Sequence, residues 1–298
     1  MNRLLIKSII KNRYAYLYIS PFYILFAIFG AFPIGYALYL SFFEWDGISE
    51  RIYIGFTNYI NIFSDNLFWK SILNTVIMAV LAHIPMLFLA LLIAFLINTN
   101  LVNKFFKELL RTLYFMPIIT SSVAVALVFM TLYGQQYGLI NSILKIIGIS
   151  PIDWWGGSGF FIKPAIIILF IWRWIGWNMV IYLAGFQSIP SDLYEAAEID
   201  GATKIRVFFS IALPIIKPII LYTVIMSTIG GLTMFEEPFM LVGTSGGTNS
   251  EGLTMSLYLY SQAFEFSHFG YASAFGFLIS LIIFLFSIIN LKLFRTER

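Results

Sequence analysis

The chain offers few residues for covalent or metal chemistry. It has no cysteine in 298 residues and only two histidines, His83 and His268, which fall in different segments. Disulfides, thiol nucleophiles and zinc–thiolate sites are therefore excluded, and a histidine-based metal site or triad is not expected. No G-x-x-x-x-G-K-[ST] phosphate loop occurs, so ATP hydrolysis by that route is excluded as well. We expect no catalytic residues, no metal and no cofactor bound by this chain, and the small net charge of +3 gives no support to a nucleic-acid role.

The remaining candidates are polar side chains in or beside strongly apolar segments. Arg173 lies within such a segment, and a charge in the membrane must face a partner or water unless it extends to the outer surface. Asn178 either cross-links helices or lines a polar path. Glu236 and Glu237 offer acceptors to a hydroxyl-rich solute if they face a cavity; otherwise they are acids of an external loop. His83 is expected to be a helix-packing residue.

Membrane-spanning helices must position these side chains. The chain is 60% hydrophobic and only 11% charged, whereas soluble domains are about a quarter charged. A bilayer core of roughly 30 Å needs about 20 helical residues. Six segments qualify or nearly so, and the fifth is expected to end at the two glutamates. They run over Ile19–Ser41, Ile72–Ile97, Leu113–Tyr133, Ala165–Leu183, Ile219–Phe235 and Tyr271–Leu291. The shorter apolar stretch Leu139–Ile149 is expected to lie flat in the outer interface.

Basic residues predict the orientation of these spans. Six spans place both termini on one side, and cytoplasmic loops carry an excess of Lys and Arg. The side with the termini has Arg3, Lys7, Lys11, Arg13, Lys104, Lys107, Arg111, Lys204, Arg206, Lys217, Lys292, Arg295 and Arg298; the other has Arg51, Lys70, Lys145 and Lys163. Both termini are therefore predicted to be cytoplasmic. No soluble domain is expected between the spans, because the longest polar stretches are only the predicted external segments Glu44–Ser71 and Glu236–Gly270. The sequence thus predicts an all-α integral membrane protein with a single transmembrane domain over residues 1–298.

A predicted cytoplasmic loop, Pro190–Pro218, has a defined local structure. Ser191 is expected to be the N-cap of a short helix, which has small residues at Ala196 and Ala197. Gly201 allows the positive φ that ends a helix. A second helical stretch follows and is interrupted by two prolines. The pattern predicts a helix–turn–helix with an acidic, small-residue tip, suited to a groove on another protein; an ordinary solvated loop is the alternative.

The spacing of particular residues in this loop also matches the pattern of a known family. Glu195-Ala196-Ala197, three residues, Gly201, nine residues and then Ile211-x-Leu213-Pro214 fill every fixed position of that pattern. The loop resembles the signature loop of ATP-binding-cassette importer permeases. Four further stretches resemble the sugar branch of that family. They are Asp200-Gly201-Ala202, Gly176-Trp177-Asn178-Met179, Leu213-Pro214-x-x-x-Pro218 and Gly270-Tyr271-Ala272-Ser273-Ala274. The two ends of the chain resemble the first permease of maltose-type pairs.

This resemblance implies the six-helix fold of type I importer permeases and a set of partners. These are a second, homologous permease in a heterodimer, two ATPase subunits that hold ATP and Mg, an extracellular sugar-binding protein, a sugar and the lipid of the bacterial cytoplasmic membrane. The residues implied in ATPase coupling are Glu195, Ala196, Ala197, Asp200, Gly201, Ile211, Leu213 and Pro214, within a coupling loop at about 190–218. Asn178, Glu236 and Glu237 are the candidates for the substrate path.

Three other functions stay open at this point. A permease of the same family could carry a non-sugar solute such as glycerol phosphate. An ion-coupled secondary transporter would need carboxylates in the middle of its spans, and the sequence suggests none there. An integral membrane enzyme would need a cluster of catalytic side chains, and no His, Cys or paired-acid constellation is evident.

Overall fold

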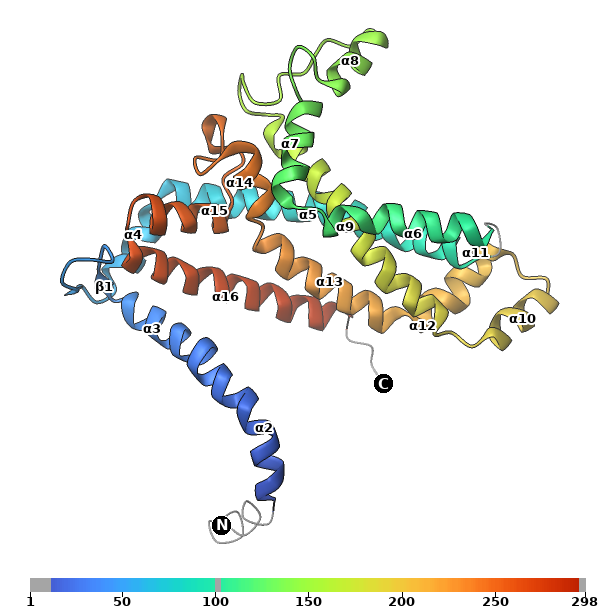
Figure 1. The fold of residues 1–298 in the computed structure, drawn as a ribbon, viewed down its shortest axis with the longest axis horizontal. Coiled ribbons are helices and arrows are strands. Elements are labelled where there is room, and N and C mark those ends of the chain that lie inside the picture. Colours follow the sequence, from blue (N-terminus) through green and yellow to red (C-terminus); the bar gives the residue numbers. More distant parts are fainter. Residues whose placement is uncertain (1–11, 100–102, 295–298) are drawn as a thin grey trace. The chain divides into compact units, whose positions relative to one another are not determined.

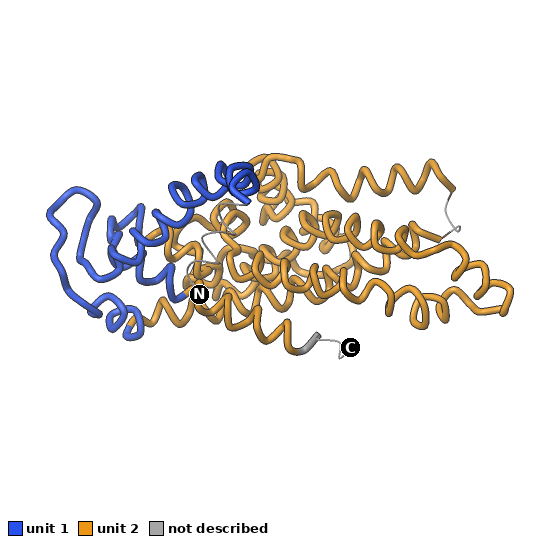
Figure 2. Tube along the Cα trace, turned by 90° about the horizontal axis from the view of Figure 1, so that it is seen from below, with its two compact units in different colours: residues 1–64, 262–278 blue, residues 65–261, 279–298 orange. Residues whose placement is uncertain are grey.

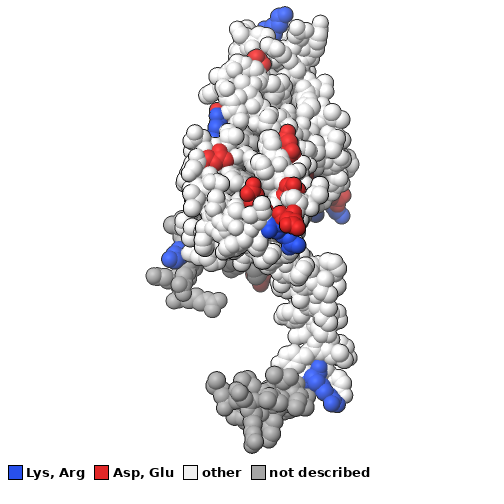
Figure 3. Space-filling view, turned by 90° about the vertical axis from the view of Figure 1, so that its left-hand side faces the viewer, with Lys and Arg blue, Asp and Glu red and all other residues white. Residues whose placement is uncertain are grey.

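The computed structural model describes residues 12–99 and 103–294, and helices make up most of it (Figure 1). Five basic residues used for the predicted orientation lie outside the described residues, namely Arg3, Lys7, Lys11, Arg295 and Arg298. Figure 3 shows one face on which most atoms belong to uncharged residues, as expected for a chain that lipid surrounds.

The chain divides into two compact units, coloured separately in Figure 2. The first combines the residues up to 64 with 262–278, and the second combines 65–261 with the residues from 279 onward. The prediction of one transmembrane domain is not tested by this division and stays a prediction.

The first unit holds a long apolar helix and a small hairpin. Its elements are α2 (Arg13–Phe26), a π-helical turn (Ala27–Ala31), α3 (Phe32–Leu40), β1 (Phe43–Glu44), β2 (Ile52–Tyr53), α4 (Thr57–Ser64) and the start of α16 (Phe269–Phe294). Strands β1 and β2 pair antiparallel. The buried Asn58 amide donates to the carbonyls of Ser41 and Phe43, 2.9 Å away in each case, and so ties α4 to the hairpin.

The second unit contains the remaining elements. They are α5 (Asn66–Asn98), α6 (Lys104–Ile119), α7 (Ser122–Leu132), α8 (Leu139–Ile146), α9 (Ile162–Gln187), α10 (Ser191–Ile199), α11 (Lys204–Val207), a π-helical turn (Phe208–Ala212), α12 (Leu213–Ile215), α13 (Lys217–Leu232), α14 (Glu236–Val242), a 3-10 turn (Thr248–Ser250), α15 (Met255–Tyr260) and a π-helical turn (Ser261–Glu265) that reaches into the first unit. Helices α5 and α9 share the most extensive helix–helix contact, and α6 and α13 pack against them.

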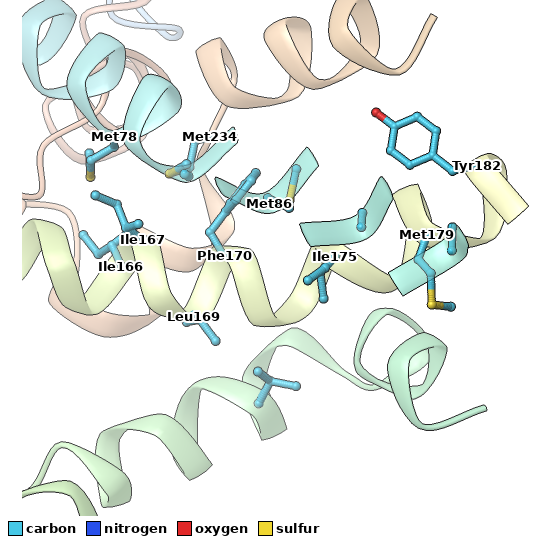
Figure 4. Close-up of a cluster of buried hydrophobic side chains, with 14 of the residues drawn as sticks. Met78, Met86, Ile166, Ile167, Leu169, Phe170, Ile175, Met179, Tyr182 and Met234 are labelled. Carbon is cyan, nitrogen blue, oxygen red and sulfur yellow. The ribbon is translucent and has the colours of Figure 1, made fainter. Parts of the chain in front are cut away.

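The core of the second unit follows from the spacing of buried residues on α5. Met78, Ala82, Met86, Ala90 and Ala94 recur at every fourth position, and each is at most 1% exposed. Residues four apart lie on one face of a helix, and small residues on that face let a neighbouring helix approach closely. Helix α9 contributes larger side chains to this core; Figure 4 shows Ile166 and Phe170 on the side of Met78 and Met86.

Within residues 12–99 and 103–294, five helices are long and apolar enough to cross a membrane, or six if one bent pair counts as a single span. The five are Arg13–Leu40, Asn66–Asn98, Ile162–Gln187, Lys217–Val242 and Phe269–Lys292, and the bent pair is α6 with α7. All six predicted segments overlap these helices, so the predicted all-α membrane fold is confirmed.

The third predicted span is wrong as a continuous helix. Helices α6 and α7 meet at an angle of 101° instead of continuing through Leu113–Tyr133. The break falls at Thr120 and Ser121, both with extended backbone, just after Pro117 in the last turn of α6. Hydroxyl side chains compete for backbone hydrogen bonds and favour helix ends, a signal that an average over apolar residues misses.

The fifth span also departs from the prediction. Helix α13 ends at Leu232, but a helix resumes at Glu236 and the apolar segment continues to Val242. The two glutamates therefore do not end the span; they occupy the first turn of α14, where a helix N-terminus favours negative charge. The stretch predicted to lie in the outer interface is helical over Leu139–Ile146, and its depth in the membrane stays a prediction.

The segment after α14 is tied to α5 and α9 by polar contacts. The Glu251 carboxylate pairs with the ammonium groups of Lys70, at 3.1 Å, and Lys163. Asn74 donates to the carbonyl of Ser250 at 2.9 Å. Burial acts to raise the pKa of Glu251, but the two lysines outweigh it and hold that pKa below its usual value.

Candidate functional site

A cavity of about 490 Å³ opens within the second unit between α5, α9, α13 and the start of α14. We call it the central pocket. Its aromatic lining consists of Phe170, Trp174, Trp177, Tyr222 and Phe235, and its polar lining of His83, Asn178, Thr223, Ser227, Thr233, Glu236 and Glu237. Apolar walls with a few convergent polar groups are typical of sites for small molecules, and the volume lies in the range of such sites.

A charged cluster closes one end of this pocket. The guanidinium of Arg173 donates through Nη1 to Glu236 Oε2 at 2.8 Å and to Glu237 Oε1 at 3.1 Å. Its Nη2 donates to Ser122 Oγ at 2.6 Å, and that hydroxyl donates in turn to Glu236 Oε2 at 2.5 Å. The indole Nε1 of Trp174 completes the cluster with a 3.0 Å bond to Glu237 Oε1. Helices α7, α9 and α14 are thereby joined through one network, which we call the Arg173 cluster.

Members of the Arg173 cluster differ in their exposure. The side chains of Arg173 and Glu237 are only 9% and 5% exposed, whereas that of Glu236 is 54% exposed. Arg173 thus faces partners within the protein and does not extend to the outer surface. Removing one partner of a buried ion pair typically costs 3–5 kcal/mol. Glu237 is therefore placed to stabilise the fold, while the carboxylate of Glu236 is available to a molecule in the pocket.

The positions of these glutamates correct one sequence argument. Both belong to the apolar segment Lys217–Val242, near its end, so they lie inside a candidate span and do not follow it as expected. The sequence could not show that Arg173, from another helix, compensates them. Because each carboxylate is bonded to that guanidinium, their presence is explained without ion coupling.

Two further polar residues line the central pocket. Asn178 is 4% exposed, and its Nδ2 donates to the carbonyl of Trp174 at 3.2 Å. His83 Nδ1 lies 2.7 Å from the carbonyl of Ala79, and its ring packs edge-on against Phe170 with centroids 5.1 Å apart. His83 therefore packs between helices as expected, and it also contributes to the pocket wall.

The predicted helix–turn–helix loop follows α9 directly. Helix α10 ends at Ile199, and Gly201, two residues later, has a φ of +68°. The Gly201 amide donates to the carbonyl of Glu198 at 3.0 Å, and the Ala202 amide donates to that of Ala197 at 2.9 Å. This is the paired hydrogen-bonding pattern of a Schellman C-cap, which needs a left-handed residue at this position. The positive φ predicted for Gly201 is confirmed.

The start of the loop differs from the sequence prediction, and its second stretch agrees with it. Pro190, not Ser191, occupies the N-cap position, and Ser191 is the first helical residue with its hydroxyl directed to Asp192 at 3.3 Å. A proline side chain cannot cap, so the fixed φ of Pro190 starts the helix. The second stretch is interrupted as predicted, because Ile216 leaves helical geometry between α12 and α13, and a π-helical turn precedes α12. Pro214 and Pro218 lie in the first turns of α12 and α13, where proline is tolerated.

The coupling candidates lie on one short segment of chain but differ in exposure. Ala197 is buried; Ile211 and Leu213 are half-buried; Glu195, Ala196, Asp200, Gly201 and Pro214 are exposed. A second cavity of about 420 Å³ lies beside them, lined by residues that include Tyr194, Glu195, Glu198 and Lys204. Burial raises the pKa of Tyr194 and keeps its hydroxyl neutral. Helix α9 leads from the central pocket into this loop and α13 leads back, so the two sites share the same helices.

Comparison with known proteins identifies the family. Residues 86–296 match the family described as the binding-protein-dependent transport system inner membrane component. The chain belongs to this family. It is thus a multi-pass membrane protein and an importer permease subunit, of a kind whose ATPase activity lies with partner subunits.

Similar proteins cover almost the whole chain. The lactose transport system permease protein LacF of Rhizobium radiobacter is 34% identical, over 98% of both chains. A crystal structure of a bacterial transporter that imports the acidic polysaccharide alginate matches with a TM-score of 0.82 and 26% identity, over 98% of both chains. A crystal structure of a bacterial alginate transporter in complex with a periplasmic protein that binds an alginate pentasaccharide matches with a TM-score of 0.82 and 25% identity, over 97% and 96% of the two chains.

Proposed function

We propose that this chain forms half of the translocation path of an ATP-driven carbohydrate importer. The observation that carries the proposal is the central pocket, which combines aromatic faces with hydrogen-bond acceptors. Sugar rings present C–H groups to aromatic faces and hydroxyls to acceptors, so they need both kinds of wall. The permeases and transporters to which the chain is similar, for lactose and for alginate, support a saccharide as cargo.

Particular residues are placed for each part of this recognition. Trp177 and Tyr222 are 45% and 51% exposed, so their faces are available to stack on a ring in the pocket. Glu236 offers an exposed carboxylate. Asn178 uses its amide nitrogen on the α9 backbone, which leaves its carbonyl oxygen as an acceptor at the pocket wall.

The proposal includes the partners of the importer. A second, homologous permease completes the path, two ATPase subunits bind ATP and Mg, and an extracellular binding protein delivers the sugar at a bacterial cytoplasmic membrane in which both termini are cytoplasmic. The solved alginate transporter in complex with a periplasmic protein supports the inclusion of a binding protein among these partners. The exposed tip Glu195–Gly201 seats in a cleft of the ATPase, with Glu195 as an acceptor. When the ATPase closes, the loop moves, and α9 and α13 carry that motion to the central pocket.

Uptake by the complete importer in proteoliposomes tests this proposal, with radiolabelled lactose and maltotriose as probes. Trp177→Ala should reduce saccharide uptake about fivefold or more, because an aromatic contact contributes roughly 1 kcal/mol. Trp172→Ala is the matched control, since Trp172 lies on the same helix and is 44% exposed but does not line the central pocket. Equal effects of the two variants, or no saccharide uptake by the wild-type importer with its own binding protein, would reject the proposal.

A further inference from the structure

We infer that the central pocket selects for neutral or cationic carbohydrates and excludes anionic ones. This inference deepens the proposed function and rests on it. It starts from the charges of the Arg173 cluster, in which one guanidinium faces two carboxylates. The cluster therefore carries one uncompensated negative charge at the wall of a pocket that a solute must enter.

The hydrogen-bond geometry of the cluster suits two charged carboxylates. Every group that contacts them is a donor: the guanidinium of Arg173, the hydroxyl of Ser122 and the indole of Trp174. A carboxylate that only accepts hydrogen bonds is stabilised in its charged form. Neither glutamate is bonded to an acceptor among the residues that the structure describes, so none of these contacts calls for a proton on either of them.

The arrangement presents the negative side of the cluster to the pocket. Glu236 and Glu237 both line the central pocket, and no lysine or arginine does so in the described part of the chain. Arg173 does not line the central pocket; it lines a separate, smaller void together with Ser122 and the two glutamates. A solute in the pocket thus approaches the exposed carboxylate of Glu236 before it can approach the buried cation.

The size of the effect follows from Coulomb's law. We consider a solute whose unit charge lies about 7 Å from the one uncompensated charge of the cluster, in a medium of intermediate dielectric. The interaction changes the solute's occupancy of the pocket, or its rate of entry, roughly tenfold. Clefts lined by one sign of charge commonly change association rates by at least this factor. A uronate or a sugar phosphate is therefore disfavoured, and the same reasoning disfavours glycerol phosphate.

The fold itself does not impose this selectivity. A similar structure belongs to a transporter that imports the acidic polysaccharide alginate. The difference must therefore come from the residues at the pocket wall, and in this chain those residues are Glu236 and Glu237.

A single introduced thiol measures the charge of the pocket directly, because the chain has no cysteine. Gly230 lines the central pocket, and a Cβ added there meets nothing within 4 Å. The Gly230→Cys variant, in the assembled importer in detergent, is labelled with cationic trimethylammonioethyl or anionic sulfonatoethyl methanethiosulfonate. Each rate is divided by that of free cysteine. The pH is held at about 8, above the range in which an unperturbed imidazole takes up a proton.

The expected result is a cation-to-anion ratio of roughly ten or more. Adding Glu236→Gln should bring the ratio close to one, and Glu236→Asp should preserve it. Glu108→Gln is the matched control, since it removes the same charge from an exposed site on α6 that does not line the pocket. A ratio near one in the Gly230→Cys variant, or a preference for the anion, would overturn the inference.

A transport measurement separates this inference from the proposed function. If the importer takes up maltotriose and trigalacturonate equally well, the charge selectivity is wrong and the carbohydrate function stands. If it takes up no saccharide while the labelling ratio stays high, the carbohydrate function is wrong and the charge of the pocket stands.

Discussion

The left-handed backbone at Gly201 predicts a graded response to substitution. Its φ is +68°, and a Cβ built at this position meets nothing within 4 Å. Any change in stability on substitution therefore comes from backbone strain and not from a clash. Asparagine tolerates this conformation, alanine resists it and a β-branched valine resists it most.

Backbone strain at residue 201 favours local opening of the loop. A non-glycine residue in this region costs roughly 1–2 kcal/mol, and up to about 3 kcal/mol when it is β-branched. Opening of the Schellman C-cap exposes the Ala202 amide, which donates to the Ala197 carbonyl at 2.9 Å. Exchange protection of that amide should fall about fivefold or more for Gly201→Ala and about 30-fold or more for Gly201→Val, but only slightly for Gly201→Asn.

Hydrogen exchange on the importer in nanodiscs, resolved to single amides, measures this series, and saccharide uptake is measured beside it. Gly148→Val is the matched control: Gly148 has a φ of +80° and open space around its Cβ, but it follows α8, far along the chain from the coupling loop. Gly148→Val should loosen its own helix end and leave uptake intact. Equal Ala202 protection in Gly201→Val and Gly201→Asn would refute the strain argument. An equal loss of uptake in both valine variants would refute a coupling role for the loop.

Three other predictions concern topology, the buried ion pair and the segment after α14. A single cysteine at Ser64 should react with an impermeant thiol reagent added to intact cells, and a single cysteine at Ser191 should not. Labelling at Ser191 would contradict cytoplasmic termini. Glu237→Ala leaves Arg173 short of a buried partner and should cost on the order of 3 kcal/mol, seen as a lower melting temperature; an unchanged melting temperature would contradict a structural role. Because the pKa of Glu251 is lowered in the folded protein, its pairs with the lysines stabilise this segment fully at pH values above the usual carboxylate pKa of 4.5, and that stabilisation is lost as pH falls through the lowered pKa. Proteolysis of residues 243–253 should therefore increase over that pH range. The Glu251→Gln variant should show no such increase.

Much of the fold could be predicted from the sequence because its determinants are local. Hydrophobic length located all six membrane segments, since each backbone polar group in lipid must be paired within a helix. The turn at Gly201 was predictable as well, because the left-handed conformation is a property of one residue type. The start of α10 was misplaced by one residue, since Pro190 and Ser191 both favour a helix N-terminus and only backbone geometry separates their positions.

The Arg173 cluster could not be predicted because it depends on contacts between helices distant in sequence. Arg173 comes from α9, Glu236 and Glu237 from α14, and Ser122 from the start of α7. The bend after α6 and the break before α14 decide where Ser122 and Glu236 lie, and both features were missed. One signal was present: a cation inside a span needs a counter-charge, and the paired glutamates were the acids closest to an apolar segment. Charge balance within the membrane therefore indicated that Arg173 needs a counter-charge. The sequence does not show which acid lies beside it, or that one negative charge at the pocket wall is left uncompensated.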